Sequence, residues 1–338
     1  MMQNNDSERF DRRGFIKGIG TAAGAISLPL VGQTRGQRPS TALLTAAPDD
    51  SISTAQMQAV RRRVHEARGV PFRAETVPAE DTGEIVAFAY GIDSDGVPWQ
   101  YVGIGDDGKN VAPLKAKAER RANQFARGDF PQKQRATASD VTTQASWDRI
   151  VHDEKDYCVD PYGCVTDNFD VYQLASDGDA YQDAYSVKHV FAMEPGVRKY
   201  SSDWENDVGR PLHDWSAGDI GGEDLDEWDP LGTHDGSQTI NVSIGTSGAS
   251  LGWSYTQPAV TTIDRTSPSG NYAEWSEEFN TSTARRNTNG MKPGSRAWVN
   301  QHSSGKYHLL DVVSDGQFQN AWGSTHSVKF TWHVYVYA

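Results

Sequence analysis

The sequence predicts a mainly β protein, in which an antiparallel β-sandwich body follows a small α+β module of order α-β-β-β-α. Short apolar runs alternate with polar residues, and the chain holds 32 glycines and ten tryptophans. This composition is typical of strands joined by tight turns. The last run, residues 327–338, alternates without a break, and we find no long helical pattern after residue 142.

The first 35 residues form an export signal rather than a structural element. Arg12 and Arg13 are followed by Phe15 and Lys17, and then by a mild apolar run that ends at Val31. This pattern resembles a twin-arginine (Tat) signal, so residues 1–35 are set aside before the fold is considered. The resemblance implies a secreted protein with the Tat translocase as its partner during export. The alternative is an amphipathic N-terminal helix.

A linker and a small module come next. Residues 36–53 are polar and contain proline and threonine, which predicts a disordered linker. Apolar residues at helical spacing then predict a helix over 54–68. The module, residues 54–127, is completed by strands at 72–77, 84–90 and 97–104 and by a helix at 111–127, with a second linker over 128–141. It is either a propeptide or a permanent domain.

The body, residues 142–338, consists of runs with strand periodicity separated by turn residues. Two of these runs flank Thr246, Ser247 and Gly248 and predict a hairpin. The strands are expected at 185–193, 238–245, 249–256, 272–280, 296–302, 306–313 and 327–338. Together they predict the antiparallel sandwich.

Charge is distributed unevenly along the chain. The formal net charge is -13, and residues 36–141 hold as many acidic residues as lysines and arginines, so the excess lies in the body. Such self-repulsion is screened at high ionic strength, which predicts adaptation to concentrated salt. Without a net basic surface, nucleic acid is excluded as a partner.

The two cysteines and an acidic segment are the candidate structural sites of the body. Cys158 and Cys164 lie six residues apart, and outside the cell they predict a local disulfide. The segment 201–236 holds 11 acidic residues and three Asp/Glu-Trp phrases. It is either a Ca²⁺ site or, as the lack of EF-hand spacing favours, a salt-adapted surface loop held by its tryptophans, and no other cofactor is expected. The candidate Ca²⁺ ligands are Asp203, Asp207, Asp224 and Asp226.

No catalytic motif is recognised, so no catalytic residue is assigned. Glu274, Glu277 and Glu278 share one expected strand, which indicates a solvated strand face rather than the opposed carboxylates of a glycosidase. His189 lies on the apolar face of its strand and is expected in the core. Four late histidines could converge across strands as a metal site: His302, His308, His326 and His333.

The leader and the acidic body together resemble β-rich secreted proteins of halophilic archaea. The resemblance is carried by phrases such as Trp253–Pro258, Ala273–Trp275 and Lys292–Ser295, and it implies no particular activity. The expected hairpin alternates apolar and small polar residues as membrane-inserting hairpins do. We therefore predict a non-enzymatic effector or binding protein, such as a halocin-like antimicrobial or pore former.

Two alternatives stay open at this point. One is an extracellular hydrolase that acts on polysaccharide or protein, and the other is a cell-surface adhesive module. The partner is accordingly a cell-surface, glycan or membrane target, and the sequence does not determine the oligomeric state.

Overall fold

The computed structural model describes residues 41–47, 50–80, 83–105, 108–130, 146–175, 179, 181–246 and 248–338. The predicted export signal, with Arg12, Arg13, Phe15 and Lys17, lies outside the described residues. Most of the predicted linker over 128–141 lies outside them too.

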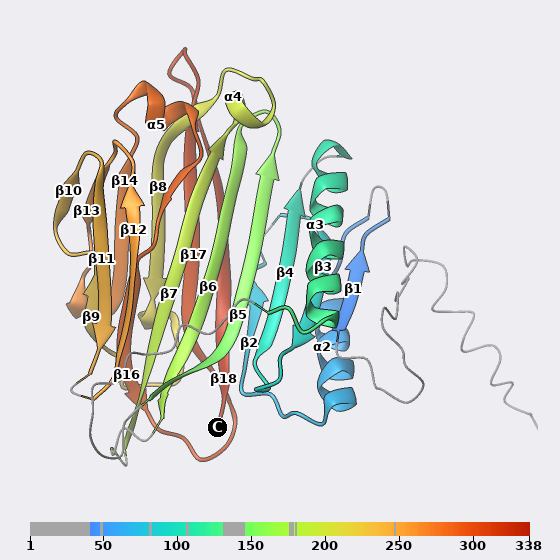
Figure 1. Ribbon diagram of the computed structural model, residues 1–338. Coiled ribbons are helices and arrows are strands. Elements are labelled where there is room, and N and C mark those ends of the chain that lie inside the picture. Colours follow the sequence, from blue (N-terminus) through green and yellow to red (C-terminus); the bar gives the residue numbers. More distant parts are fainter. Residues whose placement is uncertain are drawn as a thin grey trace, which may run out of the picture.

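The described chain is mainly β and forms a two-layered sandwich, as predicted (Figure 1). One layer is a nine-stranded sheet that is antiparallel except at one pair of neighbours. Its strands, in spatial order, are β1 (Thr41–Thr45), β3 (Ile85–Ile92), β4 (Pro98–Gly105), β5 (Ser146–Val159), β6 (Gly163–Ala175), β7 (Gln182–Pro195), β16 (Gly294–Asn300) and β9 (Asp224–Asp229), with β15 (Asn289–Met291) also paired to β7.

The second layer is a seven-stranded antiparallel sheet. Its strands, in spatial order, are β10 (Thr233–Asp235), β13 (Thr261–Asp264), β14 (Tyr272–Glu278), β8 (Glu205–Asp214), β17 (Lys306–Gln319), β18 (Thr325–Tyr337) and β2 (Ala74–Pro78). A separate two-stranded sheet consists of β11 (Gln238–Gly245) and β12 (Ser250–Gln257). Figure 1 shows β5, β6 and β7 lying across β8, β17 and β18, so that the core lies between these layers.

The two long helices lie beside β1, β3 and β4, and the two short ones lie at one end of the other strands (Figure 1). They are α2 (Thr54–Arg68), α3 (Gly108–Ala126) and the short α4 (Gly196–Lys199) and α5 (Ser282–Arg286), with 3-10 turns η1 (Trp215–Ala217) and η2 (Pro268–Gly270). Helix α2 begins at a capping box in which Ser53 and Gln56 each accept the other's backbone N–H, and it ends at left-handed Gly69.

Strand β3 is buried along its whole length because helices cover both of its faces. Phe88 and Tyr90 face the cluster that includes the apolar stripe of α2, whereas Ala87 and Ala89 face the cluster that contains Phe125 of α3. A strand that is covered on both sides carries apolar residues continuously rather than in alternation.

The structure does not confirm a separate α+β module over 54–127. Strand β4 pairs in parallel with β5 of the body, and β2 pairs with β18 of the other layer. The predicted disorder over 36–53 is wrong for the part that the structure describes, since Thr41–Thr45 pairs with β3 and its three central residues are buried. The strands of the expected module therefore extend both sheets of the sandwich.

A buried ion cluster lies between the layers. The Lys155 ammonium is 3.3 Å from Asp153 Oδ2 and 3.7 Å from Asp167 Oδ2, and all three side chains are fully buried. The same ammonium lies 3.9 Å from the ring centre of Phe169 and 4.6 Å from that of Trp332. Because Trp332 belongs to β18 and the acids to β5 and β6, the cluster joins the two sheets.

Hydrogen bonds from the second sheet support this cluster. Ser314 of β17 donates to Asp167 Oδ2 over 2.9 Å, and Thr76 of β2 donates to Asp153 Oδ2 over 2.6 Å. Burial alone would raise the pKa of Asp167, but the positive charge of Lys155 and the contact with His189 hold that pKa at about 2. Asp167 is therefore an anion at neutral pH, and its charge depends on Lys155.

Replacing Lys155 with methionine is expected to lower the free energy of unfolding by about 3 to 5 kcal/mol, because two buried carboxylates lose their counter-charge. Denaturant unfolding at neutral pH measures the change. Lys199→Met removes a surface pair with Glu194 of 3.2 Å and should cost no more than about 1 kcal/mol. Adding Asp167→Asn to Lys155→Met should recover part of the loss. Equal small effects of Lys155→Met and Lys199→Met would contradict the assigned role of the cluster.

Candidate functional site

The most distinctive surface feature is the hairpin formed by β11 and β12, residues 238–257, called the hairpin from here on. Its pairing runs in register from Gln238↔Gln257 to Gly245↔Ser250. The buried face carries Ile240, Val242, Ile244, Leu251, Trp253 and Tyr255, and the solvent-exposed face carries Thr239, Asn241, Ser243, Gly252, Ser254 and Thr256. The alternation predicted from the sequence is confirmed.

The hairpin lies within the longest stretch of the sequence that has no charged residue. Residues 236–263 contain no Asp, Glu, Lys, Arg or His, although 23% of the chain is Asp, Glu, Lys or Arg. The alternation of this segment and its lack of charge are two separate sequence signals. The lack of charge was missed from the sequence, although it marks the segment as a candidate site.

The hairpin packs on the end of the nine-stranded sheet, against β9, β15 and β16, which we call its seat. Trp253 lies directly against Gly294 of β16, where an added Cβ would come within 2.5 Å of the indole. The indole Nε1 donates to the Lys292 carbonyl over 2.7 Å, and the Lys188 ammonium lies 5.3 Å from the ring centre. Trp253 is therefore the anchor of the hairpin, and Gly294 leaves the space for it.

Two carboxylates of the seat bind the backbone of the hairpin. Asp229 Oδ2 accepts the N–H of Ser243 over 2.8 Å, and Glu227 Oε2 accepts the N–H of Gly245 over 2.6 Å. Burial raises the pKa of both carboxyl groups. These side chains pair with donors of β11 that a neighbouring strand would otherwise take, so the hairpin is attached to its seat without strand pairing.

The base of the hairpin continues into the seven-stranded sheet. Strand β10 pairs with β13 from Thr233↔Ile263 to Asp235↔Thr261, and Gly236 N–H donates to the Val260 carbonyl. The same two chain segments therefore form an antiparallel ribbon whose register shifts by one residue between its base and the hairpin. It starts in the seven-stranded sheet and bends onto the nine-stranded one (Figure 1).

Gln257 holds this bend. Its side chain is fully buried, and its Nε2 donates to the carbonyls of His234, Gly236 and Val260 at 2.9 to 3.1 Å. Its Oε1 accepts from the Thr262 hydroxyl over 2.8 Å. One amide thus connects both strands of the ribbon on both sides of the bend.

Glu277 of β14 lies beside this base. The prediction that it belongs to a solvated strand face is wrong. It is fully buried, and within the described part of the chain neither carboxyl oxygen has a hydrogen-bond partner. Burial raises its pKa to about 8, and together with burial its charge raises the pKa of Tyr255 in the hairpin. Strand periodicity predicts that Glu277 lies on the opposite face from Glu274 and Glu278. It does not show that this face is buried.

The four predicted Ca²⁺ ligands do not form a cluster in the structure. Asp226 makes a bidentate pair with Arg296 at 2.8 and 2.5 Å, and Asp207 accepts from Gln317 over 2.7 Å. Asp203 and Asp224 are exposed. Among the described residues, one group of three or more His, Cys, Asp or Glu could hold a metal ion, and none of these four belongs to it.

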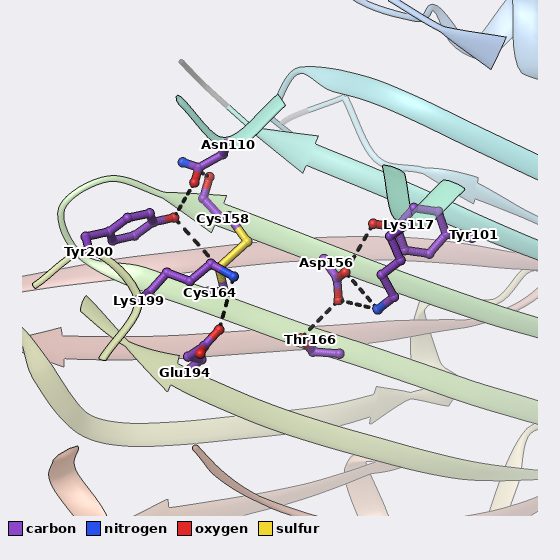
Figure 2. The surroundings of a disulfide bond; sticks show 10 residues. All are labelled: Tyr101, Asn110, Lys117, Asp156, Cys158, Cys164, Thr166, Glu194, Lys199 and Tyr200. Carbon is purple, nitrogen blue, oxygen red and sulfur yellow. Dashed lines mark hydrogen bonds and ion pairs between the residues drawn. A yellow bond between two sulfur atoms is a disulfide. The ribbon is translucent and has the colours of Figure 1, made fainter. Parts of the chain in front are cut away.

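The predicted disulfide is confirmed. Cys158 and Cys164 are directly paired on β5 and β6 and are bonded to each other. A cleft of about 270 Å³ lies beside the bond, and Figure 2 shows side chains that surround it. Each of its two carboxylates is paired with a lysine: Asp156 with Lys117 and Glu194 with Lys199. Because each carboxylate in this cleft has a lysine partner, the cleft does not present a free acid and base.

A serine, a histidine and an aspartate also meet in the core. Ser314 Oγ lies 3.2 Å from His189 Nε2, and Asp167 Oδ1 lies 3.5 Å from the same nitrogen. A catalytic triad needs the carboxylate on the other ring nitrogen, and here His213 occupies that position at 3.2 Å. All four side chains are fully buried, so the prediction of His189 as a core residue is confirmed.

Two of the four late histidines converge. His308 and His333 both contact Asp311, whereas His302 lies within 2.7 Å of the Ile220 carbonyl and His326 stacks on Tyr162. Asp311 was missed from the sequence, because its position beside His308 depends on an irregularity in β17.

Comparisons with known proteins add little to this geometry. No protein-family model and no curated protein matches the chain. A solved structure described as a "Pore forming protein" is similar with a TM-score of 0.37 and 9% identity, over 60% of this chain and 99% of that chain. A likeness this slight carries no argument about fold or function. Among the described residues, no helix has both the length and the apolar character needed to cross a bilayer.

Replacing Glu277 with glutamine tests the burial of this carboxyl group. With a pKa of about 8 when folded and about 4.3 when unfolded, Glu277 contributes stability at low pH that is lost as the pH rises toward 8. Glutamine stays neutral, so the variant should be more stable than the wild type at pH 8, by roughly 2 to 4 kcal/mol. Denaturant unfolding between pH 5 and 9 measures the difference.

Glu278→Gln is the matched control, since the neighbouring residue is part-exposed and pairs with Arg265 at 3.6 Å. This control should show no such trend. A Glu277→Gln difference that stays constant with pH would show that the carboxyl group is hydrated.

Proposed function

We propose that this chain is a secreted, non-enzymatic effector that permeabilises membranes, and that the hairpin is the segment that leaves its seat and enters the bilayer. The observation that carries the proposal is an uncharged, amphipathic hairpin attached by side-chain contacts to an acidic body. Export by the Tat route and activity in concentrated salt belong to the proposal.

The dimensions of the ribbon suit a membrane-crossing hairpin. The hairpin has eight paired positions in each strand and its base adds three. A strand that crosses the hydrocarbon core needs about 9 to 11 residues. Its six large apolar side chains all lie on one face, and small polar side chains lie on the other. This arrangement places one face toward lipid and the other toward water.

Release from the seat breaks no strand pairing within the hairpin. It uncovers the apolar face that packs in the core, and it breaks the hydrogen bonds made by Trp253, Asp229, Glu227 and Gln257. Transfer of the apolar face into lipid would offset its loss of burial. In the bilayer, unpaired backbone groups at the hairpin edges would be costly. We therefore expect several copies to pair their hairpins edge to edge, so that permeabilisation rises steeply with protein concentration.

The hydrolase alternative finds less support among the described residues. The carboxylates of the disulfide cleft are paired with lysines, and the buried Ser314, His189 and Asp167 have no triad geometry. The adhesive alternative predicts binding to cells or vesicles without leakage, so the same assay separates it from the proposal.

Leakage of a trapped dye from vesicles of halophile ether lipids tests the function, using the secreted chain at several salt concentrations. Gln257→Ala removes the bonds that hold the bend and should raise the leakage rate about fivefold or more. Gln238→Ala is the matched control. Gln238 pairs directly with Gln257 across the two strands, but its side chain makes one hydrogen bond, to the Asp235 carbonyl, so this substitution should change the leakage rate little.

A second variant asks whether the hairpin itself acts. Replacing residues 238–257 with a short Gly-Ser turn should abolish leakage, while shortening the turn at 320–324 should not. Circular dichroism and unfolding transitions verify that both variants are folded. Intact vesicles with the wild-type chain, or full leakage without the hairpin, would overturn the proposal, and vesicle binding without leakage would favour adhesion.

A further inference from the structure

A bulge in β17 brings three metal-binding side chains onto the outer face of the seven-stranded sheet. His308 and Asp311 are three residues apart, so regular alternation would place them on opposite faces. The register of β17 on β18 shifts between His308 and Leu310, and Leu309 and Leu310 are both fully buried. The extra residue turns His308 to the side of Asp311, and His333 of β18 lies directly opposite Asp311.

The three side chains converge on one point. His308 Nε2 lies 2.8 Å and His333 Nδ1 lies 2.6 Å from the same oxygen, Asp311 Oδ1. The two imidazole rings are almost perpendicular, with centres 5.0 Å apart. The side chains of His308, Asp311 and His333 are 14%, 17% and 30% exposed, so an ion can reach them from solvent.

We propose that His308 Nε2, His333 Nδ1 and the Asp311 carboxylate bind one Zn²⁺ ion, with water at the fourth position. Two imidazoles and one carboxylate suit Zn²⁺ and its transition-metal neighbours, whereas Ca²⁺ and Mg²⁺ take oxygen ligands. Each imidazole presents a lone pair once its proton has moved to the other ring nitrogen. Bonds of about 2.0–2.1 Å place ligand atoms about 3.3 Å apart, so the side chains must separate by roughly half an ångström.

The surroundings hold this triad in place. The backbone N–H of His308 donates to Asp219 Oδ1 over 2.7 Å, which fixes the chain at the bulge. The ring of Tyr335 lies 5.1 Å from that of His308. Lys306 is paired with Glu75 and lies over the ring of Tyr335, so this cation already has an acidic partner. The site shares no residue with the hairpin or its seat, and it does not depend on the proposed function.

Calorimetric titration of the chelator-treated full chain with ZnCl₂ tests the site, with CaCl₂ and MgCl₂ as reference ions. We expect one Zn²⁺ per chain and no comparable binding of the other two ions. His333→Ala should weaken Zn²⁺ binding about a hundredfold or more. Loss of a residue that only hydrogen-bonds to a metal ligand already lowers metal affinity about 10- to 100-fold, and His333 is itself a ligand. His326→Ala, which changes a histidine at the other end of the same strand, should bind as the wild type does.

Two further measurements keep the outcome clear if a variant folds poorly. Co²⁺ added to the unaltered chain should give the visible absorption of a four- or five-coordinate N/O site, and Zn²⁺ should remove it. Zn²⁺ should also raise the melting temperature of the wild type and of His326→Ala, but not that of His333→Ala. No Zn²⁺ binding by the wild type, or equal binding by all three proteins, would overturn the inference.

Discussion

The packing of the two sheets depends on the contacts that the buried ammonium of Lys155 makes with both of them. Lys155, Asp153 and Asp167 belong to the nine-stranded sheet, and the groups that complete their environment, Trp332 and Ser314, belong to the other layer. An apolar interface tolerates small shifts of one sheet over the other, but a buried charge that loses its partner costs several kcal/mol. The cluster therefore specifies how the two layers face each other.

The sequence could predict those parts of the fold that depend on local periodicity. Strand β18 was predicted at 327–338 and is found at Thr325–Tyr337, and the hairpin strands differ from their predicted bounds by one residue at most. The parallel pairing of β4 with β5 could not be predicted, since it joins segments on either side of a presumed linker. Alternation likewise assigns a side chain to a face without showing how deeply that face is buried, and for this reason Glu277 was placed in solvent.

The same limit applies to the candidate sites. The alternation of the hairpin was visible, but its attachment was not, because Asp229 and Glu227 lie in an acidic segment that the sequence explained by salt adaptation or Ca²⁺. His308 and His333 were recognised as histidines that could converge. Asp311 was missed because a single extra residue in β17, Leu309, decides on which face it lies, and a bulge of this kind has no reliable signature in one sequence.

The exposed face of the hairpin supports a role beyond the folded state described above. Thr239, Asn241, Ser243, Ser254 and Thr256 point to solvent, where acidic residues would be easily accommodated and would match the rest of this acidic chain. Proteins usually place charges on exposed ribbons, since uncharged edges pair with other chains. This chain places none over residues 236–263. Docking on the seat requires only the opposite, apolar face to be uncharged, so the lack of charge on both faces would be explained by the membrane environment that we propose. A hairpin that crosses a bilayer and pairs with copies of itself meets such an environment.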